Sequence, residues 1–249
     1  MATPPVGTPP LTPHSRAALD PIRAVSAGWR AFLANPWVSL GVLVVLFAIS
    51  LACGLVPIVN ILASALVSPA LYAGGAWFFL RGIRRENPSF ETAFEGFRRW
   101  PTVTGALLLV GLVGLLLVMP LFVVAIGTVG MAGVMSSRFD EMPGLGHVLT
   151  GPIVLTGLIV YPLMLWWNAR AGMVLFTVME ADRPSAIEAI QRSFALTRGS
   201  VWRILGLFLL FVPVLLLGLV ALCVGILPAA LVTYYAYAHA YEQLRARAA

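Results

Sequence analysis

Four long blocks of the chain carry almost no charge, and they limit the folds that this sequence can adopt. The blocks span residues 37–80, 101–135, 151–179 and 201–241. A helix that crosses the hydrocarbon core of a bilayer needs about 20 predominantly apolar residues. Every block reaches that length, and none shows the alternating pattern of a membrane β-strand. The sequence therefore predicts an all-α protein embedded in a membrane.

The lengths of the blocks predict how often the chain crosses the membrane. The first and last blocks are each about twice the length of one span, so we expect each to form a helical hairpin. The expected turns lie between Pro57 and Asn60 and between Gly225 and Pro228. The two middle blocks are one span each, and the polar outer segment 136–150 joins them. The predicted architecture is a polytopic helical bundle of six transmembrane helices, arranged as three hairpins.

The positions of the arginines predict the topology. The chain has 16 basic residues, all arginine, and a net charge of +6. With six spans, the loops on one side hold nearly all of them, and the loops on the other side hold only Arg138. Basic loops stay in the cytoplasm, so both termini are expected to be cytoplasmic in a bacterial inner membrane. Trp37, Trp77, Trp100 and Trp202 lie at the cytoplasmic ends of the predicted spans, where an aromatic belt would place them.

Composition limits the partners. Only 10% of the 249 residues are charged, against about 25% in soluble domains, so we expect no separate water-soluble catalytic domain. A basic chain can bind nucleic acid or an anionic membrane surface. Because the arginines flank the apolar blocks, we expect contact with the lipid bilayer and its anionic headgroups on the cytoplasmic leaflet, and none with nucleic acid. A membrane protein complex is a further expected partner.

A short amphipathic helix is predicted before each hairpin, because apolar residues recur there at helical spacing opposite charged ones. The apolar stripes are Ile22, Val25, Trp29 and Phe32 in the first, Phe90, Phe94 and Phe97 in the second, and Ile187, Ile190 and Phe194 in the third. Each begins near a proline, and Ser185 with Glu188 has the spacing of a capping box. Two placements remain open: on the inner membrane surface, or packed on the end of the bundle.

The predicted helices group into three repeats of one design. The repeats span about residues 20–80, 88–179 and 184–243, within a membrane domain of residues 19–243. A Pro- and Thr-rich segment, residues 1–18, has the composition of a disordered tail. Residues 244–249 form a short basic C-terminal tail.

Two stretches of the sequence resemble a known group of proteins. "PSAIEAIQRSFALTRGSVWRILGL" and "AVSAGWRAFLANPW" resemble an uncharacterised family of bacterial six-pass membrane proteins. That family is related to the membrane domain fused to some glycerophosphodiester phosphodiesterases. The resemblance implies three helical hairpins in the cytoplasmic membrane and no agreed activity. It does not extend to the phosphodiesterase domain, so that activity is not expected here.

Residue patterns for catalysis are missing from the sequence. His14, His147 and His239 do not have metal-ligand spacing. Nucleophile-elbow, P-loop and dinucleotide-binding glycine patterns are also missing. We therefore predict a protein that is not an enzyme and needs neither cofactor nor metal.

Arg170 is the residue that most resembles a functional site, because it lies inside an apolar block. An ionisable group within a span is a functional hypothesis by default. However, Arg170 falls near the cytoplasmic end of the fourth span, where its long side chain can extend to the headgroups. We favour this second interpretation. Glu180 and Asp182 follow closely and are expected to pair with Arg170.

Three functions fit these patterns. The first is a non-catalytic scaffold, accessory subunit or envelope-maintenance protein. The second is a transporter or lipid-handling permease, which internal repeats and prolines in alternate spans favour. An intramembrane enzyme comes last. A polar central cavity would favour the transporter, and an interior filled by Leu, Val and Phe would favour the scaffold.

Overall fold

The computed structural model describes residues 19–54, 57–136, 145–182, 185–220 and 225–248. Its elements within these ranges are all helices, which confirms the all-α class. They are α1 (Pro21–Ala34), α2 (Pro36–Gly54), α3 (Pro57–Ile83), η2 (Phe90–Arg99), α4 (Trp100–Ser136), α5 (Leu145–Ala171), α6 (Val174–Glu180), α7 (Ala186–Thr197), α8 (Val201–Val220) and α9 (Ile226–Ala248). The predicted tail 1–18 and residues 137–144 of the outer segment lie outside the described residues.

The long helices follow one another as three pairs, α2 with α3, α4 with α5, and α8 with α9. A short helix precedes each pair: α1, the 3₁₀ helix η2, and α7. The expected first turn is wrong by a few residues, because Pro57 already begins α3. The fourth predicted span is not one helix, since the chain turns at Gly172 and Met173 before α6.

The starts of the short helices follow the sequence signals in part. At α1 the Asp20 side chain accepts hydrogen bonds from the backbone N–H groups of Ile22 and Arg23, at 3.1 and 3.2 Å. Such a cap satisfies amides that have no partner within the helix. Ser185 is the N-cap residue of α7, but its side chain makes no capping hydrogen bond. The predicted capping box is therefore not formed.

Four helical stretches in the described residues are long and apolar enough to cross a membrane. They are Pro36–Cys53, Phe90–Val124, Gly157–Glu180 and Val201–Val220, and they support the assignment as a membrane protein. α9 is not among them, because its C-terminal half is rich in polar side chains. α3 includes residues 57–66, whose side chains lie outside the described set.

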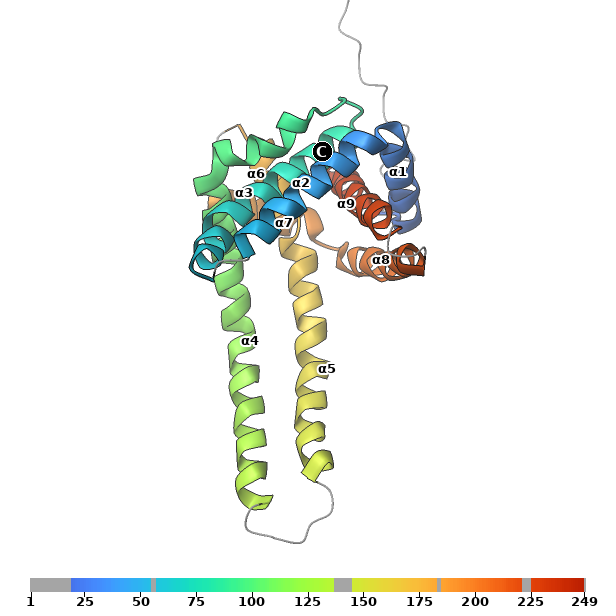
Figure 1. The fold of residues 1–249 in the computed structure, drawn as a ribbon. Coiled ribbons are helices and arrows are strands. Elements are labelled where there is room, and N and C mark those ends of the chain that lie inside the picture. Colours follow the sequence, from blue (N-terminus) through green and yellow to red (C-terminus); the bar gives the residue numbers. More distant parts are fainter. Residues whose placement is uncertain (1–18, 55–56, 137–144, 183–184, 221–224, 249) are drawn as a thin grey trace, which may run out of the picture.

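The three pairs do not form one parallel bundle. In Figure 1, α4 and α5 lie side by side and extend well beyond the other helices, while α2 and α3 run across them. Large apolar side chains along α4, such as Leu115 and Ile126, are 61% and 69% exposed. Water would make such a surface costly, so a bilayer or another apolar partner must cover it.

Each short helix packs on the last helix of another repeat. α1 crosses α9, where a Cβ on Gly28 would lie 2.6 Å from the carbonyl oxygen of Val232. η2 crosses α3, where a Cβ on Gly74 would lie 1.8 Å from the carbonyl oxygen of Ala93. Small residues are what allow backbones to approach so closely.

The third short helix, α7, also packs on helices of another predicted repeat, and there hydrogen bonds join the helices. The Ser193 hydroxyl on α7 donates to the carbonyl oxygen of Arg170 at the end of α5, at 2.7 Å. The Thr177 hydroxyl on α6 donates to the carbonyl oxygen of Ala189, at 3.0 Å. Because α1 packs on α9, these contacts link the three predicted repeats in a closed cycle.

The short helices therefore have two apolar faces, which answers part of the question of their placement. The face toward the protein is made of small residues, such as Ala24, Ala93 and Ala189, all buried. The predicted stripes of large residues lie beside it and are only partly covered. Ile22 is 73% exposed and Ile187 is 61% exposed. The small residues serve packing, and the described residues leave Ile22 and Ile187 largely uncovered.

Candidate functional site

Charged side chains from all three repeats meet at one place. Arg84 follows α3, Glu180 ends α6, and Glu242 lies near the end of α9. The Arg84 Nη2 atom lies 2.5 Å from an oxygen of Glu180 and 2.5 Å from an oxygen of Glu242. One guanidinium thus joins the three repeats, as a planar donor with several N–H groups can. We call this group, with Tyr241 and Arg245, the junction cluster.

Glu180 is the most enclosed charged member of the junction cluster, with its side chain 11% exposed. The Tyr241 hydroxyl donates to one carboxylate oxygen at 2.7 Å. The other oxygen lies 3.1 Å from Arg245 Nη1 and also accepts from Arg84. A carboxylate removed from water is tolerated when it has such partners, and removal of one partner leaves the charge uncompensated. The junction cluster therefore acts as a clamp: its ion pairs hold the ends of α3, α6 and α9 together.

The groups around Arg84 keep its guanidinium protonated. Burial by itself would lower the pKa of Arg84, but the hydrogen bonds and negative charges of Glu180 and Glu242 raise it above its usual value. The guanidinium stays charged, and the clamp persists at every pH at which the two carboxylates are ionised.

A second arginine fixes α6, the short helix that carries Glu180. Arg99 Nη1 donates to the carbonyl oxygens of Val178 and Met179, at 2.8 and 3.0 Å, and to that of Ala181. The last carbonyls of a helix have no partner within it, and a cation is favourable there. Arg99, at the end of η2, thereby positions the carboxylate of the junction cluster.

A smaller polar group links η2 to α3. The Trp77 indole N–H donates to Glu95 at 2.9 Å, and Arg81 Nη1 donates to the other oxygen of Glu95 at 3.1 Å. The Arg81 and Arg84 guanidinium groups lie 5.2 and 5.9 Å from the centre of the Trp77 ring. At that separation a cation is attracted to the face of an aromatic ring.

Arg170 does not join the junction cluster, so the expected pairing with Glu180 is wrong. Its guanidinium lies 5.2 Å from the Trp166 ring and 5.4 Å from the Phe194 ring. The Arg170 Nε atom is buried and has no hydrogen-bond partner among the described residues. The turn between α5 and α6 separates the two residues: Glu180 goes to the centre, and Arg170 stays beside α7. Asp182 is exposed and is not in the junction cluster.

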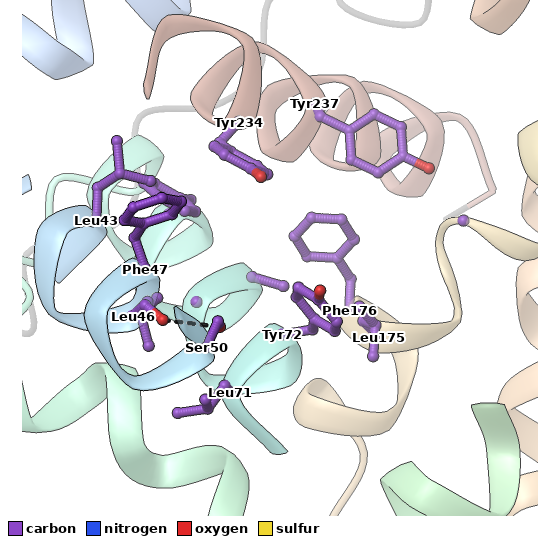
Figure 2. Close-up of a pocket in the computed structure, with 14 residues that line it drawn as sticks. Leu43, Leu46, Phe47, Ser50, Leu71, Tyr72, Leu175, Phe176, Tyr234 and Tyr237 are labelled. Carbon is purple, nitrogen blue, oxygen red and sulfur yellow. Dashed lines mark hydrogen bonds between the residues drawn. The ribbon is translucent and has the colours of Figure 1, made fainter. Parts of the chain in front are cut away.

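An apolar cavity of about 490 Å³ lies between α2, α3, α6 and α9. Figure 2 shows its aromatic walls, with Tyr234 and Tyr237 on α9 facing Tyr72 and Phe176. The Ser50 hydroxyl, also in the wall, donates to the carbonyl oxygen of Leu46 at 2.8 Å. None of the described residues that line the cavity carries a charge. All three repeats contribute to the cavity.

A wider apolar groove of about 930 Å³ lies between α1, α8 and α9. Trp29 and Val25 line it from α1, and Val214 and Leu217 line it from α8. Arg30 is the charged residue in its lining. The groove therefore brings an apolar surface and a cation together.

Metal-ligand geometry does not occur among the residues that the structure describes, where His, Cys, Asp and Glu form no group of three or more. This finding covers only that part of the chain.

Sequence reasoning missed the junction cluster. It treated Arg84 and Arg245 as loop arginines and gave no role to Tyr241 or Glu242. A signal was present, because Arg84, Glu180 and Glu242 are each among the first charged residues after the apolar part of the last helix in their repeat.

Comparison with known proteins gives one match. No curated protein and no solved structure matches the chain. The profile of a family described as "Protein of unknown function (DUF975)" matches residues 30–248. That range holds the three pairs of long helices and the whole junction cluster, so the chain belongs to the DUF975 family.

Proposed function

We propose that this protein is a non-catalytic scaffold or accessory subunit of the bacterial cytoplasmic membrane. In this proposal the chain crosses the bilayer six times, through α2, α3, α4, α5, α8 and α9, and both termini face the cytoplasm. Kinship with the membrane domain of some glycerophosphodiester phosphodiesterases belongs to the same proposal.

The junction cluster is the observation that carries this proposal. Its charged groups come from three repeats and satisfy one another at short distances. Such mutual pairing holds helices in place and leaves little free charge to bind a polar substrate. A transporter for ions or polar solutes needs polar groups that converge on an accessible cavity, whereas the two cavities described above are apolar.

The outer surfaces support a role in contacting lipid and other membrane proteins. The α4–α5 pair presents long apolar faces that no other described part of the chain covers. Arg98, Arg198 and Arg203 are exposed, and each adds about 1 kcal/mol of attraction when it lies near anionic headgroups. The junction would hold the repeats while these faces meet the bilayer and a partner.

The topology can be tested by single-cysteine labelling in intact cells. Cys53 and Cys223 are first replaced by alanine, and Ser89→Cys, Ser185→Cys and Ser137→Cys are made one at a time. A membrane-impermeant maleimide should label Ser137→Cys in cells whose inner membrane is intact. It should label Ser89→Cys and Ser185→Cys only after that membrane is opened. Labelling of all three from the same side would refute the six-span proposal.

The scaffold role can be tested by purification in a mild detergent with quantitative mass spectrometry. A stoichiometric partner that is lost when Leu115 and Ile126 on α4 are replaced by serine, while the protein itself stays folded, is the expected result. Leu209→Ser on the exposed face of α8 is the matched control. If no partner co-purifies from intact membranes after cross-linking, the accessory role is rejected.

A lipid-handling permease is the second candidate, and the apolar cavity of Figure 2 favours it. Reconstitution into liposomes that carry a fluorescent lipid in one leaflet separates the two candidates. A permease would equilibrate the lipid faster than protein-free liposomes do, and a scaffold would not.

A further inference from the structure

We propose that the cavity between α2, α3, α6 and α9 binds an uncharged lipid whose apolar chains are linked to its head through carbonyl-containing ester groups, as in a diacylglycerol. This inference does not depend on the scaffold role, since a scaffold and a permease are both able to hold such a lipid.

The size and the walls of the cavity fit a ligand. Its volume of about 490 Å³ lies within the range of about 300–1,000 Å³ that ligand pockets occupy. The walls are held by the same contacts that close the three repeats. Phe176 on α6 stacks on Tyr241 of the junction cluster, with ring centres 5.0 Å apart. Phe79 on α3 stacks on Tyr234, at 5.1 Å. The cavity is therefore formed before any ligand arrives.

The cavity opens toward the side of the protein that a bilayer would cover. Phe47 and Tyr72 line it and are 66% and 61% exposed. Neither is covered by another described helix, so lipid chains have direct access. Entry from the bilayer selects a ligand that is itself a lipid.

Two tyrosine hydroxyl groups that have no partner among the described residues identify the polar end of the ligand. On α9 the hydroxyls of Tyr235 and Tyr241 bond to Ser39 and Glu180. The hydroxyls of Tyr72 and Tyr234 bond to no described residue, and Figure 2 shows both side chains in the cavity wall. The Tyr237 hydroxyl points away from them and lies against Gly172. A phenol hydroxyl is a donor that seeks an acceptor when water is excluded. Carbonyl oxygens supply such acceptors.

The absence of charge from the described lining excludes an anionic lipid head. A carboxylate or phosphate in this apolar site would lose its hydration without gaining a cation. The arginines of the junction cluster do not supply this cation, because Arg84 and Arg245 are already paired with the carboxylates of Glu180 and Glu242. The polar end of the ligand must therefore be neutral.

Photolabelling of the purified full-length protein tests the proposal. The protein is reconstituted into phosphatidylcholine nanodiscs and exposed to a diazirine-bearing diacylglycerol, or to the free fatty acid with the same chain at pH 8. The diacylglycerol should label peptides of α2, α3, α6 or α9 in a saturable manner that unlabelled diacylglycerol prevents. Equal saturable labelling of the cavity by the fatty acid would overturn the assignment of a neutral head.

Two kinds of variant separate specific binding from general lipid contact. Tyr72→Phe and Tyr234→Phe remove a donor and keep the ring, so each should weaken binding about fivefold, as the loss of one hydrogen bond predicts. Gly75→Leu should fill the cavity, because a Cβ there meets only the side chains of Leu46 and Phe79, at 3.3 and 4.0 Å. Gly41→Leu is the matched control, since a Cβ there has nothing within 4 Å.

The outcomes are decisive in either direction. Labelling that survives in Gly41→Leu and falls in Gly75→Leu and in both tyrosine variants supports the site. Labelling that is unchanged in Tyr72→Phe and Tyr234→Phe refutes it, even if Gly75→Leu does not fold. If the photolabelling finds no lipid site but the partner protein or the topology is as proposed, the scaffold proposal still stands.

Discussion

α4 and α9 are both long helices of predicted hairpins, yet the structure uses them in opposite ways. α4 is almost wholly apolar, and most of its large side chains are left uncovered by the rest of the chain. α9 is much less apolar and lies at the centre, with Leu231, Tyr235 and Tyr241 fully buried. A helix that faces lipid needs apolar side chains, and a helix that faces other helices needs shape and hydrogen bonds. Of these two helices, the more apolar one lies at the periphery and the less apolar one is buried.

The largest expected effect comes from the clamp that holds α9. Glu180→Ala leaves Arg84 and Arg245 without one of their carboxylates and removes the acceptor of Tyr241. A broken buried ion pair costs about 3–5 kcal/mol, so denaturation of the purified protein in detergent should show a loss of that size. Glu188→Ala, at an exposed site of α7, is the control. If the two variants are equally stable, the clamp does not hold the repeats.

Truncation of a leucine tests the comparison directly. Leu231→Ala on α9 opens a cavity at a fully buried site and should cost about 2–5 kcal/mol. Leu115→Ala on α4, at a site that is 61% exposed, should change the free energy of unfolding by about 0.5 kcal/mol at most. Both are measured by chemical denaturation in the same detergent. Equal losses would show that α4 is packed against protein.

The crossing of α1 and α9 gives a third test. Gly28→Leu places a side chain where a Cβ already meets the backbone of Val232 and Ala236, at 2.6 and 2.8 Å. Overpacking costs about 1–3 kcal/mol or more, so α1 should separate from α9. Cross-linking between cysteines at Asp20 and Gln243, which are hydrogen-bonded, should then fail. Gly111→Leu on α4, where a Cβ has nothing within 4 Å, should leave the cross-link intact.

The smallest effect concerns one hydrogen bond on α9. The hydroxyls of Ser39 and Tyr235 lie 2.7 Å apart in the core. Ser39→Ala should cost about 1 kcal/mol by denaturation, since it leaves a buried phenol without its partner. Ser50→Ala is the comparison and should have almost no effect, because among the described residues the exposed Ser50 hydroxyl bonds to Leu46 of its own helix. A larger loss of stability in Ser50→Ala than in Ser39→Ala would show that α2 and α9 are not joined by the hydrogen bond between Ser39 and Tyr235.

The sequence pattern predicted much of the local architecture. The prolines and the apolar stripes predicted three short helices, and Asp20 and Ser185 stand at two of their starts. The stripes did not reveal which face meets protein, because small residues such as Gly28 and Ala93 carry almost no hydrophobic signal. Their value lies in permitting close approach, which depends on a partner far away in the sequence.

Glu180 and Arg170 show why the candidate site was only partly predicted. Both were singled out as ionisable groups near an apolar block, and their nearness in sequence suggested a pair. The turn at Gly172 and Met173 sends them to different surroundings, and the partners of Glu180 come from Arg84 and Arg245. Sequence proximity fails here because charge pairing depends on distance in space, and a single break in a helix redirects everything beyond it.

The sequence by itself determined that the chain is helical and apolar enough for a membrane, and it predicted a design of three repeats. These properties depend on side-chain chemistry and on spacing within about 20 residues. Only the tertiary structure decided that α1 packs on α9, that α9 contributes many residues to the largest core cluster, and that one arginine joins the three predicted repeats. Those features arise from contacts between residues as far apart as Asp20 and Gln243, which no local pattern encodes.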